Sequence, residues 1–386
     1  MMGKFRKLEF NELNEELISK SPPEIVLDLL AGYYRYHLSQ NDQAKDYLIQ
    51  RGLSQEVIDK FEIGLSPGGF GQTVSQAKNK VWQSKVQSVL PRTMAAEQLQ
   101  QQIMAILDIT GVTKNSENGS VFDRFRGRIV IPIKDQSGQV VSFGGRVFGD
   151  NEYGPKYLNG ADSPFFHKQQ VIYGLDQVVK NHNVNAFTQP EIQVIEGYMD
   201  VISMHQFGYH TAVATMGTAI NPQQIEMLFQ YTNRLHFCFD GDEAGRKAAN
   251  RAVNNAIPCM YGAREVRVTF LPEGHDPDSL LRQSCSSLVP TSEDIKMGRM
   301  DLQHELDNSM SLEEYLVERY MSDLQTTWEE EPALLASSLI KDIVEMPQGS
   351  ESASQLKDYV KIQLSSAGSE AMSEQSLITQ FQTMMS

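Results

Sequence analysis

Cysteines and long apolar runs are both scarce in this sequence of 386 residues. The three cysteines, Cys238, Cys259 and Cys285, lie more than twenty residues apart, which excludes a zinc ribbon built on Cys-x-x-Cys pairs and a disulfide framework. We expect them to be reduced thiols. No apolar stretch approaches the roughly 18 to 20 residues of a membrane span, and the start, MMGKFRKLEF, lacks the apolar segment of a secretory signal. These absences predict a cytoplasmic protein.

Positive charge is also in short supply, because 34 basic residues against 49 acidic ones give a formal net charge of −15. Sixteen of the acids but only four of the bases lie from Asp301 onward, so this tail carries −12 and residues 1–300 carry only −3. A nearly neutral body can still present a basic face to nucleic acid. The window from Phe122 to Lys168 holds seven bases and five acids and is the predicted anion-binding surface.

The pattern of apolar residues changes along the chain. Ser21 and Glu24 have the spacing of a capping box ahead of an amphipathic helix, and residues 46–61 predict further helices. Residues 128–147 predict a β-hairpin with a turn at Ser137-Gly138. From Glu191 onward short apolar strands alternate with amphipathic helices, which indicates a parallel sheet with right-handed crossovers. The last 86 residues carry only helical patterns, with a loop expected at residues 347–354.

Acidic residues follow three of the predicted parallel strands. They are Glu196 after IQVI, with Asp200 one helical turn later, Asp240 and Asp242 after LHFCF, and Asp276 and Asp278 beyond VRVTFLP. Because carboxyl ends of parallel strands line one crevice, these acids should converge. Two carboxylates 4 Å apart repel by roughly 4 kcal/mol at an effective dielectric near 20, so a divalent cation is expected among them. All-oxygen ligands favour Mg²⁺ or Mn²⁺ and serve phosphoryl transfer, although each acid taken singly could instead cap a helix.

Three blocks in this order, EGYMD (196–200), FDGDEAGRKAA (239–249) and GHDPDSLL (274–281), resemble the Toprim domain of bacterial DnaG-type primases. The rest of that family's RNA polymerase core is similar to further blocks upstream, namely YLIQRGLS (47–54), FDRFRGRIVIPIKD (122–135), SFGGRV (142–147), PKYLN (155–159), FFHK (165–168) and IYGL (172–175). The resemblance implies an α/β protein with a mixed α+β N-terminal subdomain, a central Toprim domain with a Rossmann-like parallel sheet, and a C-terminal helical subdomain. The expected boundaries are residues 1–20 for an N-terminal extension, 21–185, 186–290 for the Toprim domain, and 291–386 for the acidic helices.

The resemblance also implies roles for individual residues. Glu196, Asp240 and Asp242 match the catalytic metal ligands of the family, and the wider set that binds two or more Mg²⁺ or Mn²⁺ ions adds Asp200, Asp276 and Asp278. The basic groove that holds template and nucleotide matches Arg51, Arg124, Arg126, Arg146, Lys156, Tyr157, Asn159 and Lys168. The family's usual Cys/His zinc module and helicase-binding domain are not expected within this chain.

The implied activity is that of a DNA-directed RNA polymerase, a primase that joins ribonucleoside triphosphates into short primers on single-stranded DNA and leaves an RNA–DNA hybrid. A replicative helicase and a zinc-binding module are expected to act through other chains or missing domains. The chain is then either an excised fragment or a naturally split protein, encoded by a bacterium or by a phage. A Toprim nuclease and a non-catalytic, template-binding primase subunit remain as alternatives, because both would share part of these residues.

Overall fold

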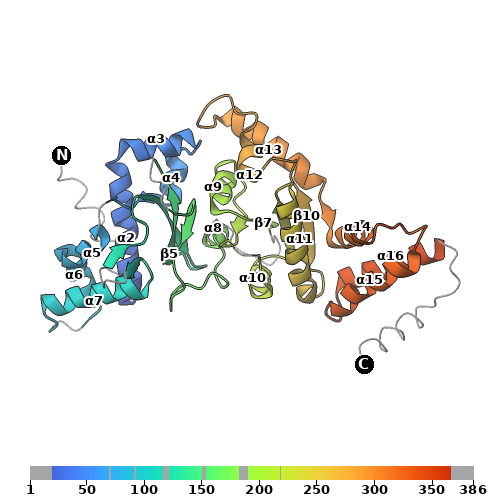
Figure 1. The fold of residues 1–386 in the computed structure, drawn as a ribbon, viewed down its shortest axis with the longest axis horizontal. Coiled ribbons are helices and arrows are strands. Elements are labelled where there is room, and N and C mark those ends of the chain that lie inside the picture. Colours follow the sequence, from blue (N-terminus) through green and yellow to red (C-terminus); the bar gives the residue numbers. More distant parts are fainter. Residues whose placement is uncertain are drawn as a thin grey trace. The chain divides into compact units, whose positions relative to one another are not determined.

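The computed structural model describes residues 20–68, 71–90, 93–115, 121–149, 154–181, 190–217 and 219–366. The chain forms two compact units, one of residues 1–177 with 285–294 and the other of residues 178–284 with 295–386 (Figure 1). We call them unit 1 and unit 2. Nearly all of the expected N-terminal extension lies outside the described residues. The four expected domain boundaries stay predictions.

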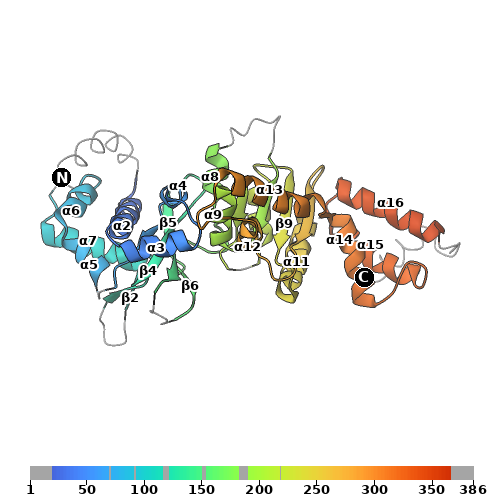
Figure 2. The ribbon, with the colours of Figure 1, turned by 90° about the horizontal axis from the view of Figure 1, so that it is seen from above.

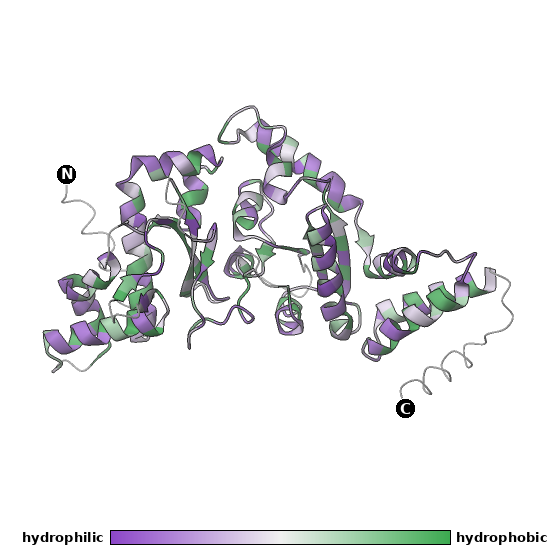
Figure 3. Ribbon diagram, in the orientation of Figure 1, coloured by the Kyte–Doolittle hydropathy of each residue, from purple (hydrophilic) through white to green (hydrophobic). Residues whose placement is uncertain are grey.

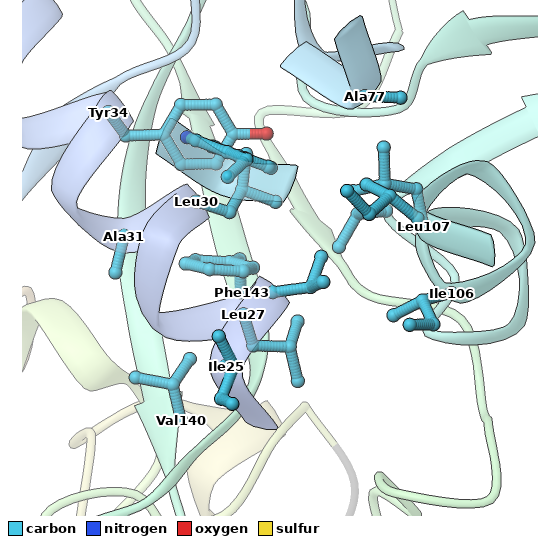
Figure 4. Packing of buried hydrophobic residues seen from close by; sticks show 14 of the residues in the cluster. Ile25, Leu27, Leu30, Ala31, Tyr34, Ala77, Ile106, Leu107, Val140 and Phe143 are labelled. Carbon is cyan, nitrogen blue, oxygen red and sulfur yellow. The ribbon is translucent and has the colours of Figure 1, made fainter. Parts of the chain in front are cut away.

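Unit 1 is organised around helix α2 (Pro22–Ser39), which begins with the predicted capping box between Ser21 and Glu24. The buried face of α2 packs with α7 and strand β5, where Leu30, Leu107 and Phe143 meet in one apolar cluster (Figure 4). Strand β1 approaches α2 so closely that a Cβ on Gly64 would lie 2.6 Å from the Tyr34 backbone. Glycine at this position therefore lets the sheet pack directly on the helix.

The sheet of unit 1 is antiparallel, with the strand order β1-β4-β5-β6. Its centre is the predicted hairpin, in which β4 (Arg128–Lys134) pairs with β5 (Val140–Val147), and this prediction is confirmed. Gly138 in the connecting turn has a φ of +88°, a conformation that glycine adopts without strain. The edge strands are short, β1 being Gly64–Leu65 and β6 Tyr157–Asn159.

Small elements surround this sheet. They are α3 (Asp42–Gln50), α4 (Gln55–Lys60), α5 (Gln72–Ser75), the 3₁₀ helix η2 (Gln76–Lys78), α6 (Lys80–Gln87), α7 (Ala96–Ile109) and the paired strands β2 (Thr113–Asn115) and β3 (Val121–Asp123). The Asp123 carboxylate accepts hydrogen bonds from the backbone N–H groups of Thr73 and Val74, so β3 anchors the start of α5. Helix α8 (Leu175–Asn181) ends this part of the chain.

Unit 2 contains a five-stranded sheet with the order β11-β10-β9-β7-β8. The strands β7 (Ile192–Ile195), β8 (Ala212–Ala214), β9 (Arg234–Phe239) and β10 (Glu265–Phe270) are parallel, which confirms the predicted Rossmann-like sheet. Helix α11 (Glu243–Ala256) packs on β9 and β10, and α9 (Tyr198–Gln206) packs with α12 (Pro277–Arg282) (Figure 2). The remaining crossover elements are α10 (Pro222–Leu228) and η3 (Ile257–Cys259). The strands are largely hydrophobic, while the outer faces of the helices are hydrophilic (Figure 3).

The C-terminal part of unit 2 is helical, as predicted, with one exception. Its helices are α13 (Ser292–Asp307), which starts at the junction of the two units, α14 (Leu312–Leu324), α15 (Pro332–Glu345) and α16 (Glu351–Ser366). The exception is β11 (Met310–Ser311), which pairs antiparallel with β10, so the prediction of helices alone was wrong here. The expected loop at 347–354 is also shorter, because α16 begins at Glu351.

Two observations concern the expected class of protein. All three cysteines are free, which confirms the prediction of reduced thiols. Within the described ranges, no helix is both long enough and apolar enough to cross a bilayer.

Candidate active site and nucleic-acid interface

The acids of unit 2 lie at the carboxyl edge of its parallel sheet. Strand β7 ends at Ile195, directly before Glu196, and its neighbour β9 ends at Phe239, directly before Asp240. Strand β10 pairs with β9 in parallel, and the loop after it leads to the N-cap of α12 at Asp276. The topology therefore brings the three acidic segments to one edge, as the strand-end argument predicts.

Three glycines let these segments approach one another. A Cβ on Gly197 would clash with the carboxylate of Asp200, and one on Gly245 would clash with the Asp240 carbonyl oxygen. A Cβ on Gly241 would run into the backbone of the loop that follows β10, at Leu271. No role was predicted for these glycines from the sequence, although Gly197 lies in EGYMD and the other two lie in FDGDEAGRKAA. A glycine near a predicted metal ligand could have indicated them, because glycine is favoured where another segment lies against the backbone.

Three of the acids, Asp200, Asp240 and Glu196, have raised pKa values. Burial, followed by the charges of Asp276, Asp278 and Asp240, raises the pKa of Asp200 to about 8. Burial, Glu196 and two further acids raise the pKa of Asp240 to about 6. Burial and the charge of Asp242 likewise raise the pKa of Glu196, which Arg251 partly opposes. Each acid is thus held close enough to its neighbours to disfavour their ionised forms.

Helix capping accounts for part of this arrangement. Asp242 is the N-cap of α11 and accepts a 2.7 Å hydrogen bond from the Gly245 N–H at Oδ1. Asp276 is the N-cap of α12 and accepts a 2.7 Å bond from the Ser279 N–H, also at Oδ1. The alternative reading of capping therefore holds for these two acids. Both caps use Oδ1, which leaves Oδ2 of each carboxylate for a further ligand.

The donor set suits a hard divalent cation. Carboxylate oxygens are the ligands that Mg²⁺ and Mn²⁺ prefer, and a cation would relieve the repulsion that raises the pKa values of Asp200 and Asp240. Among the residues that the structure describes, however, no three His, Cys, Asp or Glu side chains are already gathered as a ligand group. The fold thus supplies the positions and the shared field, while the carboxylates remain spread apart.

A cavity of about 210 Å³ opens beside Glu196. Its floor is apolar and includes Phe237 and Phe239 of β9, and its rim includes Thr215 and Arg251. Arg251 lies on α11 and was missed by the sequence argument. Its position on the helix after the Asp240 loop is set by packing and carries no motif of its own.

The predicted basic surface of unit 1 contains a larger hollow of about 510 Å³. Arg124 and Arg126 line it, together with Arg128, another base of the predicted anion-binding window, and Lys114, for which no binding role was predicted. Arg124 Nε donates a hydrogen bond of 3.1 Å to the Asn159 carbonyl oxygen, and Arg128 Nη1 donates one of 2.9 Å to that of Pro155. These bonds fix the segment that carries β6 against β3 and β4.

A second group of predicted groove residues gathers around Arg146 of β5. Its Nε donates a hydrogen bond of 2.6 Å to the Tyr47 hydroxyl of α3, and its guanidinium lies 4.8 Å from the centroid of the Tyr157 ring. Lys156 Nζ lies 5.8 Å from the same ring. Arg51 caps the end of α3, and Lys168 lies in the loop after β6, where its N–H bonds to Asp162. The structure thus collects Arg146, Lys156 and Tyr157 and places the others on neighbouring elements.

Comparison with known proteins independently relates both parts of the chain to known families. Residues 33–179 match the family described as "DNA primase catalytic core, N-terminal domain", and residues 193–281 match the family described as "Toprim-like". A DNA primase of Pasteurella multocida is 36% identical over 323 residues, which cover 83% of this chain and 49% of the relative. The chain thus spans about half the length of this curated relative, and 36% of that of a Pseudomonas putida DNA primase.

Solved structures match the chain over nearly their whole length. A DNA primase domain from Pseudomonas aeruginosa is 31% identical with a TM-score of 0.72, covering 93% of this chain and 99% of that one. A DnaG primase catalytic domain bound to single-stranded DNA is 31% identical with a TM-score of 0.71, covering 88% of this chain and 98% of that one. The fold is therefore similar to that of known DNA primase catalytic domains.

Proposed function

Because the chain belongs to the family of DnaG-type DNA primase catalytic cores, we propose that it synthesises short RNA primers on single-stranded DNA. The observation that carries this proposal is the field of acids at the edge of the unit 2 sheet, in the same chain as the basic hollow of unit 1. Primer synthesis needs both features. The acids must support attack on the α-phosphorus of a nucleotide, and the basic hollow must hold the polyanionic template.

The acids are proposed to hold two or more Mg²⁺ or Mn²⁺ ions. Glu196, Asp240 and Asp242 are the catalytic ligands in this proposal, and Asp200, Asp276 and Asp278 complete the set. Bound divalent ions would activate the attacking 3′-hydroxyl and neutralise the pyrophosphate that leaves. The chain's own contribution is to aim the ligands, since the caps at Asp242 and Asp276 fix those two carboxylates against helix N-termini.

The basic residues of unit 1 are proposed to bind the template and the incoming ribonucleoside triphosphate. The set is Arg51, Arg124, Arg126, Arg146, Lys156, Tyr157, Asn159 and Lys168. Arginine suits this task because its planar fork binds phosphate oxygens in pairs, and Tyr157 offers a partly exposed ring on which a base can stack. Support comes from the related DnaG catalytic domain that was solved with single-stranded DNA.

Partners beyond template and nucleotides belong to the same proposal. The RNA–DNA hybrid is its product, and a replicative helicase and a zinc-binding module are its expected protein partners, acting from other chains or from further domains. Each of these follows from family membership alone.

The test is incubation with single-stranded DNA, labelled ribonucleotides and Mg²⁺ or Mn²⁺. The proposal expects oligoribonucleotide products from the wild type and none from Asp240→Asn or Glu196→Gln, whose thermal stability without metal should not fall because each substitution relieves carboxylate repulsion. Asp358→Asn on the exposed face of α16 is the matched control, because it removes the same charge far along the sequence from the acidic loops. Shortened DNA would favour a Toprim nuclease instead, and binding without products a template-binding subunit.

A further inference from the structure

One stretch of unit 1 has an unusual charge for this acidic protein. Residues 63–96 contain four basic residues, Lys78, Lys80, Lys85 and Arg92, and no acidic residue. The acid that precedes the stretch, Glu62, is already neutralised by Lys134, whose Nζ lies 2.9 Å from Glu62 Oε1. Three of the four bases lie in the described residues, where Lys78 and Lys80 are exposed and Lys85 is half-buried. None of them belongs to the groove of the proposed function.

The helix that carries Lys80 and Lys85 also carries Trp82, the first of a series of aromatic rings. Helices α2 and α6 pack together (Figures 1 and 2), and Tyr33 of α2 lies 6.4 Å from Trp82 of α6, measured between ring centroids. The series continues along α2 through His37, 4.4 Å from Tyr33, to Tyr36, 5.6 Å from His37. The rings become more exposed along this series, from 5% for Trp82 to 59% for Tyr36.

The outer end of this series has the properties of a stacking platform. Tyr36 is exposed but keeps an edge contact with His37, so its ring is supported from one side. Burial lowers the pKa of His37, so its ring is neutral at physiological pH and adds no hydration penalty to stacking. Arg35 is exposed on the same helix. Exposed aromatic rings among basic side chains are the features by which proteins hold single-stranded nucleic acid without reading its sequence.

We infer that the face formed by Tyr36, His37, Lys78, Lys80 and Lys85 is a second contact for single-stranded nucleic acid, separate from the basic groove. This inference deepens the proposed function, on which it rests, by assigning a further binding surface for the same template. The face adjoins the groove along the chain, since Gly68, which lines the 510 Å³ hollow, lies within the acid-free stretch. Asp123, which also lines that hollow, anchors the start of α5 through Thr73 and Val74. The start of the acid-free stretch is thus tied to the hollow that the proposed function assigns to the template.

The experiment compares binding of fluorescent oligodeoxythymidylates of about 8 and about 30 nucleotides over a range of salt concentrations. A triple variant, Lys78→Gln, Lys80→Gln and Lys85→Gln, should lower the log–log salt slope for the long strand by about 2, or about 0.7 per lost contact. The short strand, which fills only the groove, should keep its slope. Lys357→Gln on α16 is the single-charge control.

The aromatic part is tested with tyrosine variants. Tyr36→Ala should weaken binding of the long strand by about fivefold or more at unchanged salt slope, whereas Tyr36→Phe should bind like the wild type. Tyr261→Ala is the matched control, because Tyr261 is similarly exposed, at 54%. Unchanged binding in both sets of variants would overturn the inference.

The groove variant Arg146→Ala separates failure of this inference from failure of the proposed function. If Arg146→Ala weakens binding while the face variants do not, the template groove stands and the second contact is refuted. If the wild type binds no single-stranded DNA at all, the proposed function itself fails. If the face variants weaken binding of an acidic protein partner but not of DNA, the face is a protein-docking surface and the inference is wrong.

Discussion

Replacing Asp200 with asparagine should stabilise the metal-free protein at neutral pH. The Asp200 carboxyl has a pKa of about 8, against 3.8 for the unperturbed group, because it is buried and faces three other acids. A raised pKa means that the folded state binds the proton more tightly than the unfolded chain does. Stability is therefore greatest below about pH 4 and is lost as the pH rises from there through about 8.

The magnitude follows from the same two values. At pH 7 the unfolded chain has given up its proton, and keeping the folded group protonated costs about 1.4 kcal/mol for each pH unit above 3.8, or about 4 kcal/mol. Protonation of neighbouring acids shares part of this penalty. We therefore expect Asp200→Asn to raise the free energy of unfolding by about 2 to 4 kcal/mol at pH 7. Asparagine keeps an oxygen that can accept the hydrogen bond from the Asp278 N–H.

The assay is urea unfolding in a chelating buffer at about pH 4.5 and about pH 7, with Asp358→Asn as the control on an exposed helix. The gain should be largest at neutral pH and much smaller at pH 4.5, because less than one unit above 3.8 only about 1 kcal/mol of the penalty is present. Added Mg²⁺ should stabilise the wild type more than Asp200→Asn. An equal loss of stability in the variant at both pH values would refute the reasoning, because Asp200 would then be a structural hydrogen-bonding group without charge strain.

Three further variants test other contacts. Gly241→Ala should abolish activity with little loss of global stability, because the new Cβ would push the Asp240 loop away from Leu271. Primer synthesis measures the activity and urea unfolding measures the stability. Asp294→Asn should lower thermal stability more at pH 7 than at about pH 2, because hydrogen bonds from neighbouring backbone and hydroxyl groups hold the pKa of Asp294 below its usual range and their stabilisation declines as the pH falls below 3.8. Arg146→Lys should weaken DNA binding although the charge is retained, because lysine lacks the planar guanidinium that bonds to Tyr47 and at the same time faces the Tyr157 ring. Equal affinity of the variant and the wild type in salt titrations would contradict this.

The sheets were predictable because their signals are local. The hairpin of β4 and β5 shows as two apolar runs around Ser137-Gly138, and the parallel strands of unit 2 show as short apolar runs between amphipathic helices. Strand β11 could not be predicted, since two residues carry no periodicity and their pairing with β10 depends on a tertiary contact. The early start of α16 is a boundary error of a few residues, which reflects how weakly single residues determine helix ends.

The residues of the candidate site were likewise predictable only in part. The acids were found because strand ends are visible in the sequence and the rule for parallel sheets places them together. Which acids also cap helices was not visible, because each helix start carries two acids, Asp242 with Glu243 and Asp276 with Asp278, and the fold selects Asp242 and Asp276 as the caps. Arg251 was missed, and the contact of Arg128 was not predicted, for a related reason. The sequence does not show which groups an arginine will contact, because packing alone brings Arg251 beside Glu196 and Arg128 to the Pro155 carbonyl.

The strong net negative charge of the chain is compatible with a nucleic-acid substrate because the excess of acids is concentrated from Asp301 onward, in unit 2. The acidic field and the acidic helices belong to unit 2, whereas the basic hollow and the acid-free stretch belong to unit 1. Screening in physiological salt limits the reach of an exposed charge to about 8 Å, so only charges within that distance of a phosphate affect its binding strongly. Net charge thus describes the solubility of the whole chain, while the attraction of a template is decided by the charges within one Debye length of its phosphates.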